Sequence, residues 1–322
     1  MLMKMWIRKI AVATLALCAL LLLYLMPNSE KVDYQLSQDN IEYIYTNTVE
    51  TIYLLDSNNY IARTTMKGCD CDTKETAKDI LQGLIIDGEK SNIIPNGFRS
   101  IIPSGTEVLD IALENKILTI NFSKELLDIS IEYEEKMIES IIYSLTSIDG
   151  IDKVVIKVEG ETLSKLPNSG KSLPAVLDKS YGINKTYDLV NTSDIDSYTV
   201  YYVSNFNDNE YYVPVTKYVN KSNQDKIKVI IDELSTSPIY ETNLMSYLSS
   251  NVSLIDYTMD DKTLTLNFND SILSDNDSDK ILEEVIYTIS LSVMDNFSVE
   301  EVSILVDNEE IYKNSLKSLE IN

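Results

Sequence analysis

The sequence contains no histidine and only three arginines. Without histidine the chain lacks the commonest general base, the Ser-His-Asp and Cys-His nucleophile systems and every zinc site that uses imidazole. Its 322 residues carry 51 acidic side chains against 27 lysines and arginines, a formal net charge of −24. Recognition of nucleic-acid phosphates needs a basic face. The shortage of positive charge therefore excludes nucleic acid as a partner. The absence of histidine excludes most hydrolytic mechanisms.

Cysteine is also scarce, with only Cys18, Cys69 and Cys71 in the chain. Such sparse use argues against a disulfide framework. A bridge between Cys69 and Cys71 would close a very small ring, so we favour two free loop thiols, with an intermolecular disulfide as the alternative. A metal site would need two more soft ligands, which cysteine and histidine cannot supply here.

One long apolar run without charge, residues 10–26, stands near the N-terminus after Lys4, Arg8 and Lys9. Its length reaches the low end of a membrane-spanning helix, and the preceding charges place the N-terminus in the cytoplasm. We predict an uncleaved signal anchor over residues 1–26, a polar stalk over 27–50 and the remaining chain outside the cytoplasm. A cleaved signal peptide and a lipoprotein acylated at Cys18 are the alternatives.

Residues 51–160 and 199–308 repeat one pattern of apolar residues. Each copy opens with a β-rich run and continues with a helix whose apolar residues follow the i, i+3, i+4, i+7 rule. We expect Thr73 to cap the first of these helices and Ser222 or Asn223 to cap the second. A β-hairpin follows in each copy. The matched sets are 51–55 with 199–203 for the opening run, Ala77, Ile80, Leu81 and Leu84 with Ile227, Ile230, Ile231 and Leu234 for the helix, and 118–122 with 264–268 for the hairpin.

A second helix in each copy is placed by its apolar residues at Met137 to Leu145 and at Ile281 to Ile289, an offset of 144 that also pairs Tyr143 with Tyr287. Each copy closes with an alternating strand. The predicted class is α+β, with two tandem β-α-β-β-α-β domains in which two helices cover one face of a small mixed sheet. The predicted boundaries are 51–160 for the first domain, 161–198 for a linker, 199–313 for the second domain and 314–322 for a tail.

Two acidic clusters are candidate sites. Asp275-Asn276-Asp277-Ser278-Asp279 suggests a calcium loop, but Lys280 and Ile286 stand where an EF-hand needs Gly and Glu. We interpret this run as an acidic cap for a helix over 281–291. A carboxylate pair for glycoside cleavage is conceivable among Glu132, Glu134, Glu135 and Glu139, but a solvated helix face is the preferred interpretation. We therefore predict no catalytic, cofactor-binding or metal-binding residues, no cofactor and no enzymatic activity.

Several stretches follow the pattern of a known domain family. The opening Ile52-Tyr53-Leu54 strand, the helix 77–84 and the strand 154–160 occur in the family's order. Ile102 to Leu109 is similar to the family's "iP.Gt.v" entry to the hairpin, and Leu118 to Ser123 is similar to its "v.vdfS" strand. On these motifs the chain resembles the GerMN-domain family of sporulation and germination proteins. The resemblance implies tandem domains that look like the ring-building motifs of secretion-like channels.

The resemblance also implies a role. It implies an anchoring or scaffolding component of the channel-type assembly between mother cell and forespore, outside the cytoplasm and without catalysis. We therefore expect protein partners in an envelope complex, possible self-association, membrane attachment through the N-terminal helix and no small-molecule substrate. The alternatives are a cell-wall module that binds or trims peptidoglycan or cortex, and a general envelope protein unconnected with spores.

Overall fold

The computed structural model describes residues 49–236, 243–274 and 277–315. The first repeat contains the strands and helices β1 (Val49–Asp56), β2 (Ile61–Lys67), α2 (Thr73–Leu84), β3 (Phe98–Arg99), β4 (Val108–Glu114), β5 (Ile117–Phe122), α3 (Glu134–Leu145), β6 (Lys153–Val158) and β7 (Glu161–Thr162). The second contains β9 (Ile195–Phe206), β10 (Asn209–Asn220), α4 (Lys226–Thr236), β11 (Leu254–Asp260), β12 (Thr263–Phe268), β13 (Leu273–Ser274), β14 (Asp277–Ile281), α5 (Glu283–Asn296), β15 (Glu301–Val306) and β16 (Glu309–Ser315). Between them lies β8 (Thr186–Asp188), and short 3₁₀ turns occupy 91–93, 124–127, 179–181 and 270–272.

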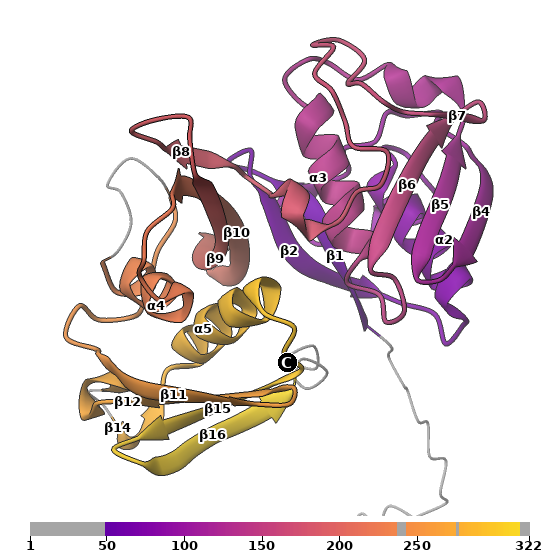
Figure 1. Ribbon diagram of the computed structural model, residues 1–322. Coiled ribbons are helices and arrows are strands. Elements are labelled where there is room, and N and C mark those ends of the chain that lie inside the picture. The colour runs from indigo at the N-terminus through magenta and orange to yellow at the C-terminus, as the bar shows by residue number, and fades with distance from the viewer. Residues whose placement is uncertain (1–48, 237–242, 275–276, 316–322) are drawn as a thin grey trace, which may run out of the picture. The chain divides into compact units, whose positions relative to one another are not determined.

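The two helices of each repeat lie between two β layers (Figure 1). One layer is a four-stranded mixed sheet, ordered β4-β5-β6-β7 in the first repeat and β11-β12-β15-β16 in the second. The other layer is the opening hairpin, β1–β2 or β9–β10. Apart from the short strands β3, β13 and β14, the order is therefore ββαββαββ. The predicted sheet with both helices on one face is only one of the two β layers of each repeat. The hairpin forms a separate layer because the second helix of each repeat is buried along nearly all of its length. Its serines, Ser140 and Ser144 in α3 and Ser292 in α5, bond the backbone of the hairpin.

The first helix of each repeat has the predicted amphipathic face. Ala77, Ile80, Leu81 and Leu84 are buried in α2, as are their four counterparts in α4. The caps differ from the prediction by one to three residues. Asp72 accepts from the backbone N–H groups of Lys74 and Glu75, and Asp225 accepts from those of Ile227 and Lys228. A carboxylate one residue before the first helical residue reaches these free N–H groups.

The second helices match at an offset of 148, and the predicted offset of 144 was wrong. Ser144 on α3 accepts from the backbone N–H of Tyr53, and Ser292 on α5 accepts from that of Tyr201, each at 2.9 Å and across 91 residues. Tyr143 is therefore equivalent to Leu291 and not to Tyr287. A slip of four residues is nearly one helical turn, so it leaves an apolar stripe almost unchanged.

The strand motif at 118–122, which recurs at 264–268, is alike in the two repeats because its asparagine has the same structural role in both. Asn121 accepts from the backbone N–H of Gly160, and Asn267 accepts from that of Asn308, so each asparagine holds the turn that follows the last parallel strand. Gly160 and Asn308 both have positive φ, 86° and 71°. Glycine and asparagine are the residues that adopt this conformation at least cost.

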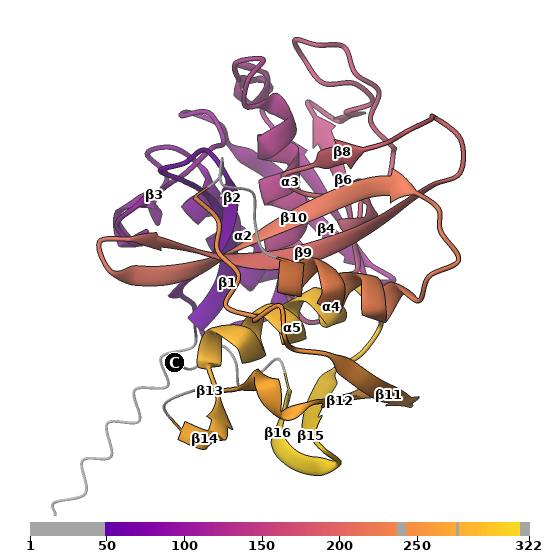
Figure 2. The same ribbon diagram turned by 90° about the vertical axis from the view of Figure 1, so that its left-hand side faces the viewer.

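Each repeat has its own hydrophobic core, and a few residues of each repeat pack in the core of the other. Tyr201 and Leu291 from the second repeat pack in the first core, and Ala62 from the first packs in the second. The predicted linker also contributes, because Leu166, Leu173, Leu177 and Ile183 are buried in the first core. The segment that follows β7 is thus packed on the first repeat, and Figure 2 shows it passing over α3 before β8.

Candidate functional site

The opening hairpins of the two repeats meet in one sheet. Strands β2 and β10 pair antiparallel at Arg63 and Tyr212, which joins the order β3-β1-β2-β10-β8 with β9 on β10. The register of each hairpin makes Ile61 equivalent to Tyr212 and Arg63 equivalent to Pro214. Equivalent strands therefore pair with each other, which is the arrangement of a two-fold, isologous interface.

Asn184 completes this pairing two residues along each strand. Its side-chain oxygen accepts from the N–H of Ile61 at 2.9 Å, and its amide donates to the carbonyls of Ile61 at 2.7 Å and Pro214 at 2.8 Å. Pro214 has no N–H and cannot form an ordinary ladder bond there. The amide of Asn184 thus takes the place of a missing strand-to-strand bond at the junction.

A buried polar cluster lies beside the same junction. The hydroxyls of Tyr53 and Tyr201, equivalent residues 148 apart, are 3.0 Å from each other. Tyr201 donates to Asp295 at 2.6 Å, and the ammonium of Lys179 lies 2.5 Å from the other oxygen of that carboxylate. Burial raises the pKa of Tyr201 well above its usual value, and the neighbouring Asp295 raises it further. This tyrosine is a neutral donor at any physiological pH.

A second contact between the repeats involves Asp56 and Tyr211. Tyr211 donates to Asp56 at 2.8 Å and accepts from Ser204 at 3.1 Å. Burial, supported by the hydrogen bond to Asp56, raises the pKa of Tyr211 to about 12. The other oxygen of Asp56 accepts from the backbone of Asn58 and Tyr60, which closes the β1–β2 turn.

The predicted solvated face at the start of α3 was wrong for two of its four glutamates. Glu134 and Glu139 are only 2% and 3% exposed, whereas Glu132 is exposed and Glu135 half-buried. Glu134 accepts from the backbone N–H groups of Asn168 and Ser169. These glutamates face the segment 161–187 that folds back over α3, a long-range contact that local periodicity does not show.

The pKa values of the two buried glutamates move in opposite directions. Burial alone would raise the pKa of Glu134, but hydrogen bonds from Ser169 and Asn168 outweigh it and lower the pKa. For Glu139 burial dominates and raises the pKa, although Lys185 at 3.3 Å partly offsets it. These carboxylates anchor the segment 161–187 to α3. Among the described residues no group of three Asp, Glu or Cys could hold a metal ion.

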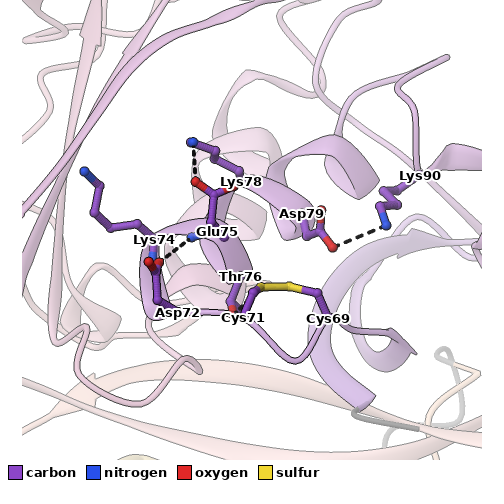
Figure 3. Close-up of a disulfide and its surroundings, with 9 residues drawn as sticks. All are labelled: Cys69, Cys71, Asp72, Lys74, Glu75, Thr76, Lys78, Asp79 and Lys90. Atoms are coloured by element: carbon purple, nitrogen blue, oxygen red, sulfur yellow. Dashed lines mark hydrogen bonds and ion pairs between the residues drawn. A yellow bond between two sulfur atoms is a disulfide. The ribbon is translucent and has the colours of Figure 1, made fainter.

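The remaining sequence-predicted features lie elsewhere. Cys69 and Cys71 form a disulfide just before α2, with Cα atoms 5.3 Å apart, and Figure 3 shows it beside Asp72 and Thr76. The expectation of two free thiols was wrong, because this separation lies within the range that a disulfide bridges. The acidic run at 275–279 does not cap a helix over 281–291, since Asp277–Ile281 forms β14 and α5 begins at Glu283.

The edges of the two four-stranded sheets carry a matched irregularity. In β4 the register shifts between Val108 and Asp110, and in β11 it shifts between Leu254 and Asp256. The extra residue in each case is a large apolar one, Leu109 or Ile255, with 46% and 49% of its surface exposed. A β-bulge re-aims a side chain, and bulges concentrate at sheet edges and near functional sites.

Several of these residues were missed by sequence reasoning. Asn184 and Lys179 lie in a segment without apolar periodicity, and Asp295 lies at the C-terminal end of α5, beyond the helix predicted over 281–291. No local pattern sets these three residues apart. Tyr53 and Tyr201 carried a usable signal, because they are matched polar-tipped residues in otherwise apolar strands of both repeats. A phenol buried at the same place in each copy needs a partner, and here each serves the other.

These features define a class: a tandem α+β repeat protein whose two copies pair through equivalent strands. The chain belongs to the Germane family, whose description is "Sporulation and spore germination". The family matches residues 51–164 and 199–312, one match in each repeat. Spore germination protein GerM of Bacillus subtilis (strain 168) is 33% identical over 263 residues, 80% of this chain and 71% of that protein.

A solved structure agrees with the relationship. The tandem GerMN domains of the sporulation protein GerM from Bacillus subtilis superpose with a TM-score of 0.74 at 32% identity, covering 81% of this chain and 92% of that one. The resemblance drawn from the sequence motifs is therefore confirmed, and so is the tandem α+β organisation.

The predicted anchor, residues 1–26, the lipidation alternative at Cys18 and nearly all of the stalk lie outside the described residues. Within the three described stretches no helix is long and apolar enough to cross a bilayer.

Proposed function

We propose that this protein is a non-enzymatic scaffold of the sporulation or germination machinery, held at a membrane by residues 1–26 with its domains outside the cytoplasm. In a sporulating cell this places the domains between mother cell and forespore, in a channel-type assembly. Support comes from membership of a family described by sporulation and spore germination and from the positive residues that precede the apolar run at 10–26.

The observation that carries the proposal is the matched pair of bulges in β4 and β11. Leu109 and Ile255 occupy the same position in the two repeats and are both about half exposed. A large apolar side chain held outward on an edge strand costs solvation, and a bulge interrupts the ladder that would otherwise extend the sheet into another chain. The pair therefore suits side-chain docking to a partner better than continuous strand addition.

Two such surfaces on one tether act together. Once a partner engages one repeat, a site on the other repeat meets it at a high effective concentration, which raises avidity without new contacts. A complex of several envelope proteins, or of several copies of this chain, gains most from such an arrangement. No reacting group is needed for this role.

The experiment is complementation of an endospore-forming host that lacks its own copy of the gene. The double variant L109K/I255K is expected to accumulate to normal levels, to lose its cross-links to neighbouring envelope proteins and to leave sporulation impaired. The matched control is I131K, because Ile131 is 65% exposed yet lies outside both edge strands. This control is expected to behave as the wild type.

Full complementation by the double variant would refute the docking role of the bulges. Catalysis is tested separately by incubating the purified protein with peptidoglycan sacculi. Release of soluble muropeptides would refute the non-enzymatic assignment and favour the cell-wall alternative.

A further inference from the structure

A cavity of about 430 Å³ lies between α3, the segment 161–187 that folds back over α3, and β10. Its walls come from Glu135 on α3, from residues between Lys171 and Tyr187, and from Tyr218 on β10. The volume falls within the range of small-ligand sites. The scaffold role proposed above makes no use of this cavity.

The cavity has a flat aromatic wall. Tyr187 and Tyr218 are cross-strand neighbours on β8 and β10, and their rings stack with centroids 5.0 Å apart and planes 17° from parallel. Tyr187 nevertheless leaves 61% of its surface exposed. The stack fixes the orientation of an aromatic face that remains open to a ligand.

The polar groups of the cavity are fixed by one another. Glu135 binds Lys171 at 2.9 and 3.0 Å and Lys185 at 2.6 Å, and Lys185 also lies 3.5 Å from the centre of the Tyr181 ring. Asp178 accepts from the backbone and hydroxyl of Ser180. These contacts hold charged donors and acceptors in place before any ligand arrives, which lowers the entropy cost of binding.

The charges of the lining cancel. The lining carries two lysines, Lys171 and Lys185, and two carboxylates, Glu135 and Asp178, so it has no excess of either sign. Both lysines pair with Glu135, and Asp178 lies 3.5 Å from Lys153. A charged ligand of either sign, such as a phosphate, would meet as many repelling charges as attracting ones. The lining suits a neutral ligand that offers many hydroxyl groups and one apolar face.

Proline-rich peptides and sugars are two neutral ligand classes that bind on aromatic walls. Proline-rich peptides insert into grooves between aromatic rings, but here the two tyrosine rings contact each other and leave no slot between them. A pyranose ring instead lays its C–H face on one open aromatic face while its hydroxyls bond the charged groups at the rim. Val176, 42% exposed, and Pro174 add a small apolar surface that fits a methyl group.

We propose that this cavity binds an N-acetylated pyranose sugar of a glycan, with the ring on Tyr187, the hydroxyls on Glu135, Lys171 and Asp178, and the acetyl methyl beside Val176. The proposal is one of binding only, since the carboxylate of Glu135 is held by Lys171 and Lys185 and that of Asp178 by Ser180. The proposal is independent of the scaffold role, since it is measured on the isolated protein.

The test is ligand-observed NMR and calorimetry on the full-length protein in a detergent without a sugar headgroup. The probe is the β-1,4-linked trimer of N-acetylglucosamine, expected to bind saturably with a Kd of about 1 mM or tighter. Y187A is expected to weaken binding about tenfold, whereas Y187F keeps the ring and stays within about twofold. The matched control is Y247A, because Tyr247 is a partly exposed tyrosine, at 37%, outside the cavity.

Absence of saturable binding below about 10 mM would overturn the proposal. Equal loss of binding in Y187A and Y247A would overturn it as well, because the effect would then not be local to the cavity. Maltotriose lacks the acetamido group, and binding of maltotriose as tight as that of the probe would overturn the assignment of the acetyl contact. Tyr187-dependent binding of a decaproline peptide in place of the sugar would assign the cavity to a protein partner and refute the proposal.

Discussion

Replacement of Asn184 by alanine tests whether one side chain couples the two repeats. The change removes an acceptor from the N–H of Ile61, a fully buried residue, and two donors from the carbonyls of Ile61 and Pro214. An unsatisfied buried donor costs about 1–3 kcal/mol. Asn184 also has a φ of +45°, where alanine costs a further ~1 kcal/mol. We expect a loss of about 3 kcal/mol in the free energy of unfolding.

The backbone and hydrogen-bond contributions can be separated. Asn115 in the β4–β5 turn has a φ of +50° and is exposed, so N115A carries the backbone cost alone and should lose about 1 kcal/mol. N184G loses the hydrogen bonds but not the backbone compatibility, so it should lie between N184A and the wild type.

The assay is urea denaturation of residues 47–322, followed by circular dichroism at constant pH. Equal slopes among the variants are required for a direct comparison of midpoints. If N184A is no less stable than N115A, the bonds across the junction contribute nothing and the coupling role of Asn184 is refuted.

Three further predictions concern the buried serines, the buried glutamates of α3 and the disulfide. S144A and S292A should destabilise by similar amounts, about 1–3 kcal/mol each, because each leaves an equivalent buried tyrosine N–H without its acceptor; unequal losses in denaturation would contradict the equivalence. The lowered pKa of Glu134 stabilises the fold above pH ~4.5 and that contribution is lost as the pH falls, so E134Q should destabilise most at pH 7 and progressively less on acidification. The raised pKa of Glu139 has the opposite sign, so E139Q should gain stability relative to the wild type as the pH rises through ~4.5; pH-dependent denaturation curves check both. Replacement of both bridged cysteines by serine should cost no more than about 1.6 kcal/mol, the chain-entropy value for so short a loop, and a melting curve showing a larger loss would contradict this.

The parts of the fold that the sequence predicted well are those set by local periodicity. The buried faces of α2 and α4, and the buried strand residues Leu118 and Leu264, follow from spacing alone. The same reasoning misaligned α5 with α3 by four residues, because an apolar stripe repeats almost unchanged after one turn. Only the hydroxyls of Ser144 and Ser292, which bond a distant strand, settle that register.

The parts that were missed depend on contacts between distant segments. Glu134 and Glu139 look like ordinary surface acids on an amphipathic helix, and they are buried only because residues 161–187 fold back over α3. Asn184 and Asp295 have no local pattern that marks them as junction residues. Polar groups of this kind are specified by the partner they meet, and a single sequence does not show that partner.

The pairing of the two repeats restricts how the protein can assemble further. An isologous interface satisfies itself, since each surface meets its own equivalent and nothing remains open for a third copy. Strands β2 and β10, with Tyr53 and Tyr201 beside them, are consumed in this way within one chain. Any larger assembly must therefore use other surfaces, and it needs a different one on each side if it is to continue beyond a pair. The β4 and β11 edges are such surfaces, because they belong to two separate four-stranded sheets and their bulges leave Leu109 and Ile255 about half exposed.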